Sequence, residues 1–149
     1  MNKRTLHVLE YYKIIEQLTA HATTPSGKRL CERLKPMNDI VTIEKEQEET
    51  ADALTRIYQQ GSVSFSGVYP ISEALKRAEV GAGLSIRELI DVAKLLKVAE
   101  HARQYGEKAE SKDEEGVTGR QDSLTGYFES IMPLEHLSRE INRCILSED

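Results

Sequence analysis

The chain has 149 residues, of which 39% are hydrophobic and 30% are charged, and its formal net charge is -5. This length is sufficient for one domain with a hydrophobic core, and the acidic balance gives no general attraction to phosphate backbones. No apolar run approaches the ~20 residues that a membrane-spanning helix needs.

Two helical segments are predicted at the start of the chain. The first covers residues 4–22, where the apolar spacing changes phase near Glu10 and indicates a bend or two short helices. The second begins at Thr24, which is suited to capping, and Pro25, which is suited to a first helical turn. It ends before Pro36, because the residue before a proline disfavours helix.

A longer helix is predicted from Asn38 or Asp39 to Tyr58, with Gly61 as its C-terminal cap. Apolar and small polar residues at three-four spacing mark one side of this helix, and acidic residues mark the other. The acidic side is typical of a solvated helix face. The first side contains Ile40, Ile43, Gln47, Thr50, Leu54 and Ile57, and the acidic side contains Glu44, Glu46, Glu48, Glu49 and Asp52.

The longest predicted helix covers Ser85 to Tyr105 and forms the centre of the domain. A loop over residues 62–70, with a short strand over 63–65 as an alternative, and a short helix over 71–79 precede it. Ser85 and Glu88 have the spacing of a capping box. At 1.5 Å per residue the helix is roughly 30 Å long. Its core-facing stripe is predicted to contain Leu89, Val92, Leu96 and Ala99.

The last part of the sequence predicts a mobile loop and two helices. Residues 107–121 are polar, charged and rich in glycine, which is typical of a mobile loop. Helices follow over 123–131 and 134–146, the second with Leu137, Ile141 and Ile145 facing inward. The prediction is therefore an all-α, bundle-like domain over residues 1–149, with six or seven helices around one long central helix.

The sequence contains no motif that predicts a catalytic, cofactor or metal site. Gly27 and Lys28 match the end of a phosphate-binding loop, but Ala22 replaces the first glycine and Arg29 replaces the hydroxyl residue that would hold magnesium. The four histidines and two cysteines lack metal-ligand spacing. Two distant cysteines favour a reduced, cytoplasmic setting.

A small basic cluster is the one candidate contact site. It lies on the short helix before the acidic one, and it fits either of two interpretations. It can contact a phosphate or an acidic partner, or it can pair with the acidic helix that follows; the second interpretation is favoured. The cluster consists of Lys28, Arg29, Arg33 and Lys35.

Three stretches together resemble the bacterial MutS-two family, the MutS homologues that lack the mismatch-reading domains. The resemblance covers residues 1 to about 105 well and returns weakly over 133–146. Its most specific part is the run that leads into the long helix. The stretches are Leu9-Glu10-Tyr11, then Thr24-x-x-Gly27-Lys28-Arg29-Leu30, and then Leu75-Lys76-Arg77-Ala78-Glu79 with Leu84-Ser85-x-x-Glu88-Leu89.

The resemblance implies the N-terminal core, or lever, segment of a longer protein. Family members are dimeric ATPases with a clamp and often a nuclease domain, acting on branched DNA or on collided ribosomes. ATP and Mg would bind in the ATPase domain, outside these residues, and the remaining domains of the same chain would be the direct partners. An ending without a capping glycine after Leu146 also suggests a fragment. A free-standing helical adaptor for a protein partner is the alternative.

Overall fold

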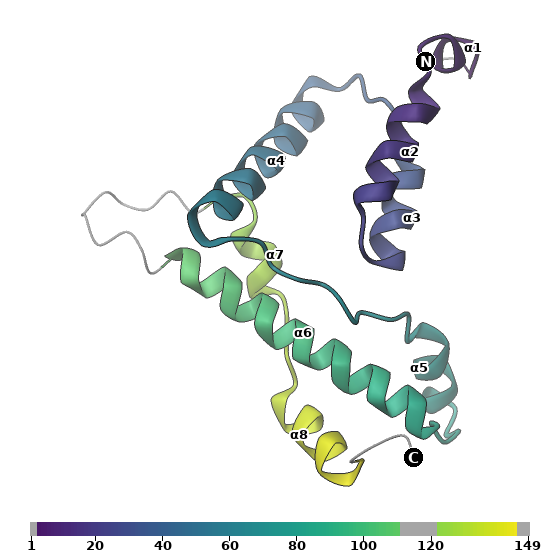
Figure 1. Cartoon of the computed structure of the whole chain (residues 1–149), viewed down its shortest axis with the longest axis vertical. Coiled ribbons are helices and arrows are strands. Elements are labelled where there is room, and N and C mark those ends of the chain that lie inside the picture. The colour runs from purple at the N-terminus through teal and green to yellow at the C-terminus, as the bar shows by residue number, and fades with distance from the viewer. Residues whose placement is uncertain (1–2, 111–121, 146–149) are drawn as a thin grey trace. The chain divides into compact units, whose positions relative to one another are not determined.

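The computed structural model describes residues 3–110 and 122–145 and divides the chain into two units, Met1–Asp39 and Ile40–Asp149 (Figure 1). The described ranges contain eight helices and no strand, so the prediction of an all-helical fold is confirmed. The alternative of a short strand over 63–65 is wrong. There are eight helices instead of six or seven because the first predicted segment forms two.

The first unit contains three short helices, and their boundaries follow local signals. Glu10 adopts a left-handed conformation (φ 52°), which separates the first two helices at the predicted phase change. The Oγ1 atom of Thr24 accepts a hydrogen bond from the amide of Gly27 at 3.0 Å, so the predicted cap is confirmed. Neither α2 (Tyr11–His21) nor α3 (Pro25–Arg33) contains a buried residue. The helices are α1 (Lys3–Val8), α2 (Tyr11–His21) and α3 (Pro25–Arg33).

The second unit is organised around α6 (Ile86–Glu110), on which α7 (Thr125–Glu129) and α8 (Glu135–Cys144) pack (Figure 1). The predicted capping box begins α6, because Ser85 Oγ accepts from the Glu88 amide at 3.3 Å and Glu88 Oε2 accepts from the Ser85 amide at 2.9 Å. The Ser85 amide and the Arg77 guanidinium together hold the pKa of Glu88 at about 2. The helices are α4 (Ile40–Gln60), α5 (Ser72–Glu79), α6 (Ile86–Glu110), α7 (Thr125–Glu129) and α8 (Glu135–Cys144).

The central helix is longer than its apolar pattern predicts. It continues to Glu110, so the predicted loop over 107–121 is wrong for residues 107–110, and residues 111–121 lie outside the described ranges. The sequence Glu-Lys-Ala-Glu that ends α6 is rich in good helix formers, which explains the extension. The apolar pattern marks only the part of a helix that packs against a neighbour.

The core of the second unit lies between α6 and α8. It consists of Val92, Ala93 and Leu96 from α6 with Ile141 from α8, and Leu96 is only 8% exposed. Val92 and Leu96, at the centre of the predicted core-facing stripe, are therefore confirmed as core residues. Leu137 is exposed, contrary to prediction, because α8 meets α6 through its second half. The partly buried residues that complete this contact are Ile71, Leu89 and Ile145.

Candidate functional site: the Arg56 cluster

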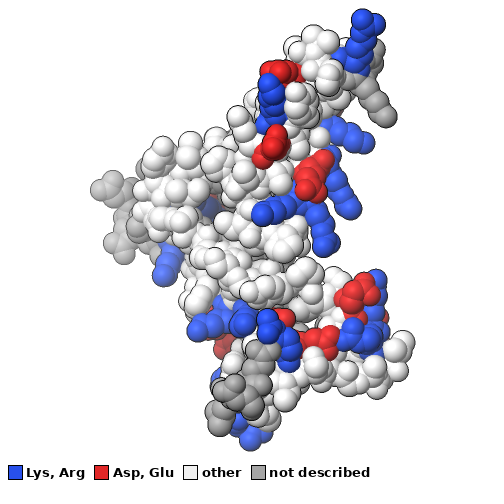
Figure 2. All heavy atoms as spheres, turned by 45° about the vertical axis from the view of Figure 1, so that its right-hand side comes forward, with Lys and Arg blue, Asp and Glu red and all other residues white. Residues whose placement is uncertain are grey.

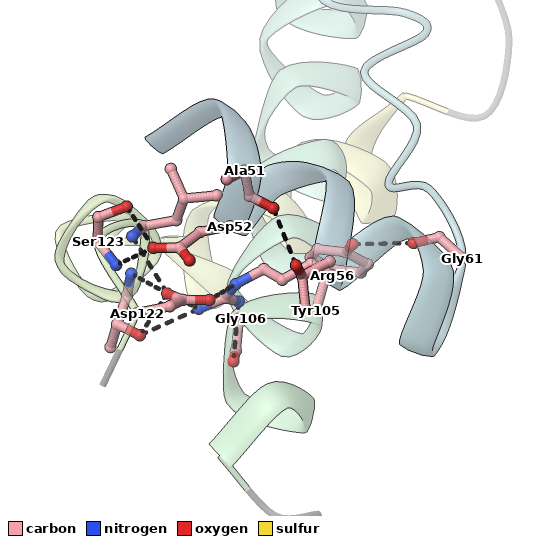
Figure 3. A network of polar contacts seen from close by, with 11 residues as sticks. Ala51, Asp52, Arg56, Gly61, Tyr105, Gly106, Asp122 and Ser123 are labelled. Carbon is pink, nitrogen blue, oxygen red and sulfur yellow. Dashed lines mark hydrogen bonds and ion pairs between the residues drawn. The ribbon is translucent and has the colours of Figure 1, made fainter. Parts of the chain in front are cut away.

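The side chain of Arg56, in α4, is buried and holds three parts of the second unit together (Figure 3). Only 3% of the residue is exposed. Its guanidinium pairs with Asp122 through both carboxylate oxygens, and Nη2 donates to Oδ1 at 2.6 Å. Nη2 also donates to Thr125 Oγ1 at 3.0 Å, and Nη1 donates to the carbonyl of Gly106 in α6 at 3.5 Å. We call Arg56, Asp122, Thr125 and Gly106 the Arg56 cluster.

An arginine suits this buried position for reasons of chemistry. A buried charge is tolerated only when it is paired and hydrogen-bonded. The planar guanidinium matches a carboxylate with two parallel hydrogen bonds, and it stays charged at all accessible pH values. The ring of Phe128 in α7 lies 4.9 Å from the guanidinium carbon, so an aromatic face covers the cation as well.

Asp122 also shapes the start of α7. Its Oδ1 atom accepts hydrogen bonds from the amides of Leu124 and Thr125 at 3.1 and 3.0 Å. The amide of Leu124 would otherwise lack this acceptor, whereas the amide of Thr125 also donates to the backbone carbonyl of Asp122 at 3.3 Å. The hydrogen bonds from Arg56, with those from Thr125 and Leu124, lower the pKa of Asp122 below its ordinary value of 3.8.

The lowered pKa of Asp122 predicts a loss of stability in acid. Its contribution is fully present above the unfolded value of 3.8 and is lost as the pH falls through the lower folded pKa. The free energy of unfolding should therefore fall more steeply with decreasing pH below about 4 in the parent protein than in Asp122→Asn. Urea unfolding at a series of pH values measures this difference. Equal slopes for the two proteins would contradict the ion pair.

A second carboxylate on the same side of α4 extends the contact to the residue after Asp122. Asp52 lies one turn before Arg56, and its Oδ2 accepts from both the amide (2.9 Å) and the hydroxyl (2.7 Å) of Ser123 (Figure 3). Glu49 accepts a hydrogen bond from the hydroxyl of Tyr127 at 3.0 Å. The polar side of α4 therefore makes the contacts with α7 and the residues before it.

This arrangement reverses part of the prediction for α4. The acidic side was interpreted as a solvated face, which is wrong for Glu49 and Asp52 because both are half-buried. By contrast, Leu54 and Ile57 on the apolar side are 51% and 47% exposed. The physical reason is that the segment beginning at Asp122 offers hydroxyl and amide groups, which need polar partners.

Aromatic packing and a hydrogen bond hold α6 beside the end of α4. The hydroxyl of Tyr105 donates to the carbonyl of Gly61 at 2.8 Å (Figure 3). The ring of Tyr105 packs at a tilt on Phe128, with 5.6 Å between ring centroids.

Next to Tyr105, Gly106 leaves room for Phe128: a Cβ at Gly106 would lie 2.8 Å from Phe128 Cγ and even nearer to Phe128 Cβ. Only glycine permits this approach of α7 to α6.

Replacing Gly106 with alanine should destabilise the protein although alanine favours helix. The clash with Phe128 should cost roughly 1–3 kcal/mol or more, against a gain of about 1 kcal/mol in helix propensity. Thermal unfolding followed by circular dichroism measures the net effect. Gly126→Ala is the matched control, because a Cβ there meets no atom within 4 Å. A melting temperature raised equally by both changes would contradict the close packing.

The structure leaves the predicted basic cluster exposed and does not test its role. Lys28, Arg29 and Arg33 lie on α3 and Lys35 follows its end; all four are exposed. No ion pair joins any of them to another residue in the part of the chain that the structure describes. Figure 2 shows basic side chains interspersed with acidic ones over the face displayed. Because the acidic α4 lies in the other unit, pairing between the two stays a prediction.

The Arg56 cluster is suited to holding helices in a fixed relation, since its members are joined by an ion pair and by hydrogen bonds, among them one from the hydroxyl of Thr125 to Asp122 Oδ1 at 3.0 Å. Over residues 3–110 and 122–145, no three His, Cys, Asp or Glu side chains gather as metal ligands would. In the same ranges no helix has both the length and the apolar character needed to cross a bilayer.

The sequence reasoning missed the Arg56 cluster, but two local signals point to it. Arg56 is a basic residue four positions after Asp52, on the side of α4 that is otherwise acidic. Gly106 lies inside a helix, where glycine costs about 1 kcal/mol relative to alanine and so suggests close packing.

Comparison with known proteins gives matches that cover all or nearly all of this chain. No protein-family model matches the chain. It is 41% identical over 149 residues to "Endonuclease MutS2" of Lachnoclostridium phytofermentans and 40% identical over the same length to that of Agathobacter rectalis. A Geobacillus protein of the same name is 34% identical over 145 residues. The chain spans only 18–19% of the length of these relatives.

Proposed function

We propose, from the premise that this chain is homologous to one segment of the MutS-two (MutS2) family, that it is the N-terminal core, or lever, segment of such a protein. The premise rests on 34–41% identity to three relatives over 145–149 residues of this chain. Since the relatives are about five times longer, the segment works as one part of a multidomain chain. Its proposed role is mechanical: it passes rigid-body movement between other domains.

The observation that supports a mechanical role is the way in which α4 is joined to α6 and α7. The junction is a buried ion pair between Arg56 and Asp122 with directional hydrogen bonds around it. Hydrogen bonds weaken steeply when their angle changes, so such a junction holds a defined orientation between long helices. The junction joins helices of 21 and 25 residues, which are long enough to carry a movement from one end of the unit to the other.

The activity of the whole protein is part of the proposal. Its relatives are named endonucleases, which supports action on a nucleic acid. We propose a dimeric, cytoplasmic ATPase and endonuclease that acts on branched DNA, on collided ribosomes, or on both. ATP, Mg and the clamp and nuclease functions are assigned to domains outside the 149 residues.

The basic cluster is assigned a minor role in gripping nucleic acid. Its four side chains, Lys28, Arg29, Arg33 and Lys35, are enough for about two or three phosphate contacts, which corresponds to a salt slope of about -2 to -3. The net charge of -5 opposes a tighter grip.

Replacing Arg56 with methionine in the full-length protein tests the mechanical role. Basal ATP hydrolysis should persist, while its stimulation by branched DNA or by ribosomes should fall roughly fivefold or more, as expected for the loss of a coupling free energy between sites. Basal activity reports only that the ATPase domain is folded, so a thermal melt of the variant beside the parent protein checks the folding of this segment. Arg143→Met is the matched control, because Arg143 forms an exposed ion pair with Glu140, one turn away in the same helix. Unchanged stimulation in Arg56→Met would contradict the proposal.

A free-standing helical adaptor is the second candidate. The exposed apolar side chains of α4, among them Leu54, Ile57 and Tyr58, support it, since such a surface can dock a protein partner. The reading frame after Asp149 separates the candidates: clamp helices and a nucleotide-binding motif there support the lever.

A further inference from the structure

A hollow of about 390 Å³ lies within the first unit, and residues of all three of its helices line it. In this unit α2 packs against both α1 and α3 (Figure 1). The volume lies at the lower end of the roughly 300–1,000 Å³ that is typical of small-molecule sites. The proposed lever function makes no use of the hollow. Its lining includes Leu6, His7, Tyr11, Tyr12, Ile15 and Glu32.

One wall of the hollow is aromatic and open to solvent. The rings of His7 and Tyr12 are stacked, with 5.8 Å between their centroids and 19° between their planes. Tyr12 is nevertheless 50% exposed, and the neighbouring Tyr11 is half-buried. Exposed aromatic faces of this kind stack on nucleobases, since every base has a π-face. The wall is therefore suited to a planar aromatic ligand.

Glu32 in α3 adds a carboxylate to the lining. The residue is exposed, and within the described part of the chain no ion pair or hydrogen bond engages its side chain. An ionised carboxylate accepts hydrogen bonds only, and its two oxygens match two adjacent N–H donors. Guanine presents two such donors on its Watson–Crick edge, N1–H and the N2 amine, whereas the other common bases place acceptors on that edge, which a carboxylate repels.

Basic side chains flank this carboxylate, and the first unit as a whole is basic. Lys28 and Arg29 lie four and three residues before Glu32, one turn earlier on α3. Residues 1–39 contain seven lysines and arginines but four aspartates and glutamates, which gives a net charge of +3 against -8 for residues 40–149. This charge favours the phosphates of a nucleic-acid strand over a basic segment of a protein.

We propose that this hollow binds one unpaired guanine of a nucleic-acid strand. The base stacks on Tyr12, its Watson–Crick edge donates to both carboxylate oxygens of Glu32, and Lys28 and Arg29 contact the phosphates on either side. A base inside a duplex does not fit, because its edge is paired and its faces are stacked. The proposal rests on the action on nucleic acid proposed above and narrows it to an unpaired base.

Fluorescence anisotropy titration of the 149-residue chain at low salt tests the base preference. The two labelled strands are thymidine tracts of about nine nucleotides, a length that one such site can cover, and one tract carries a single central guanine. The guanine strand should bind roughly tenfold more tightly, as expected for hydrogen bonds to a charged group. Inosine in place of guanine should lose most of this preference, because it lacks the N2 amine. The same strands made with uridine as RNA distinguish RNA from DNA as the ligand, and a guanine preference in either supports the proposal.

The variant Glu32→Gln separates base recognition from simple charge attraction. Removing a negative charge from a nucleic-acid site ordinarily strengthens the binding of every strand. Here it should weaken binding of the guanine strand roughly tenfold and leave the thymidine tract unweakened. Glu16→Gln is the matched control, because it removes the same charge from an exposed position of α2 outside the lining, and it should change binding less than about twofold.

The variant Tyr12→Leu tests the stacking wall. It should weaken both strands roughly fivefold or more, because stacking does not depend on the base. Tyr58→Leu is the matched control, since Tyr58 lies on α4 and is 80% exposed, and it should change binding less than about twofold. Thermal melts of all four variants beside the parent protein check that each is folded.

Equal affinity for the guanine and thymidine strands in both DNA and RNA would overturn the proposal, and so would unchanged binding of the guanine strand in a folded Glu32→Gln variant. Binding of an arginine-rich peptide that is lost in Glu32→Gln, with no oligonucleotide bound, would assign the hollow to a basic segment of a partner protein instead. Each of these results leaves the lever proposal, tested through Arg56, unaffected.

Discussion

Replacing Asp122 with alanine should lower the free energy of unfolding by about 3–5 kcal/mol, the usual cost of removing one partner of a buried ion pair. Arg56 would remain charged and almost fully buried after it had lost the carboxylate with which it pairs. The amide of Leu124 before α7 would also lose its side-chain acceptor. Urea unfolding followed by circular dichroism measures the loss.

Two further variants make the interpretation specific. Glu140→Ala removes an exposed ion pair within α8 and should cost less than about 1 kcal/mol. The double variant Arg56→Met/Asp122→Ala should be more stable than Asp122→Ala alone, because it also removes the buried charge that has lost Asp122 as its partner. A loss below about 1 kcal/mol in Asp122→Ala, or no recovery in the double variant, would show that the cluster contributes little to stability.

Replacing Leu96 with alanine should cost roughly 2–5 kcal/mol, the range observed when a large core side chain is truncated. Leu96 is 8% exposed and lies at the centre of the contact between α6 and α8, where it packs with Val92, Ala93 and Ile141. The cavity left behind removes contacts from each of these neighbours. A thermal melt, with Leu54→Ala as a control at a half-exposed position, measures the difference.

The two leucines distinguish the core from the surface. Leu54→Ala should change stability by less than about 1 kcal/mol, since its side chain is already half in water. If Leu96→Ala melted at the same temperature as the parent protein, α8 would not pack on α6 as described.

The sequence predicted those elements of the fold whose signals are local. The cap at Thr24, the capping box at Ser85 and the glycine at position 61 all act within one helical turn, and the structure contains each of them. The side of α4 that meets its neighbours was not predictable in this way. Apolar spacing indicates which side prefers an apolar partner, but α4 meets a segment that offers amides and hydroxyls to Asp52.

The Arg56 cluster was beyond sequence reasoning because its members are distant along the chain. Arg56 and Asp122 are 66 residues apart, and no periodicity connects them. The basic cluster on α3 was visible for the opposite reason: its residues are neighbours on one short helix, which makes the pattern local but does not identify its partner.

The distance between Arg56 and Asp122 also has a consequence during protein synthesis. A ribosome adds about 5–20 residues per second, so Arg56 leaves the exit tunnel roughly 3–13 seconds before Asp122 does. For that time the guanidinium is fully hydrated, and Asp52 and Glu49 beside it keep this side of α4 soluble in the nascent chain. If apolar side chains formed this junction, they would expose an aggregation-prone surface for the same time. A junction formed by an ion pair can therefore remain unformed until the end of the segment has been translated, without exposing apolar surface.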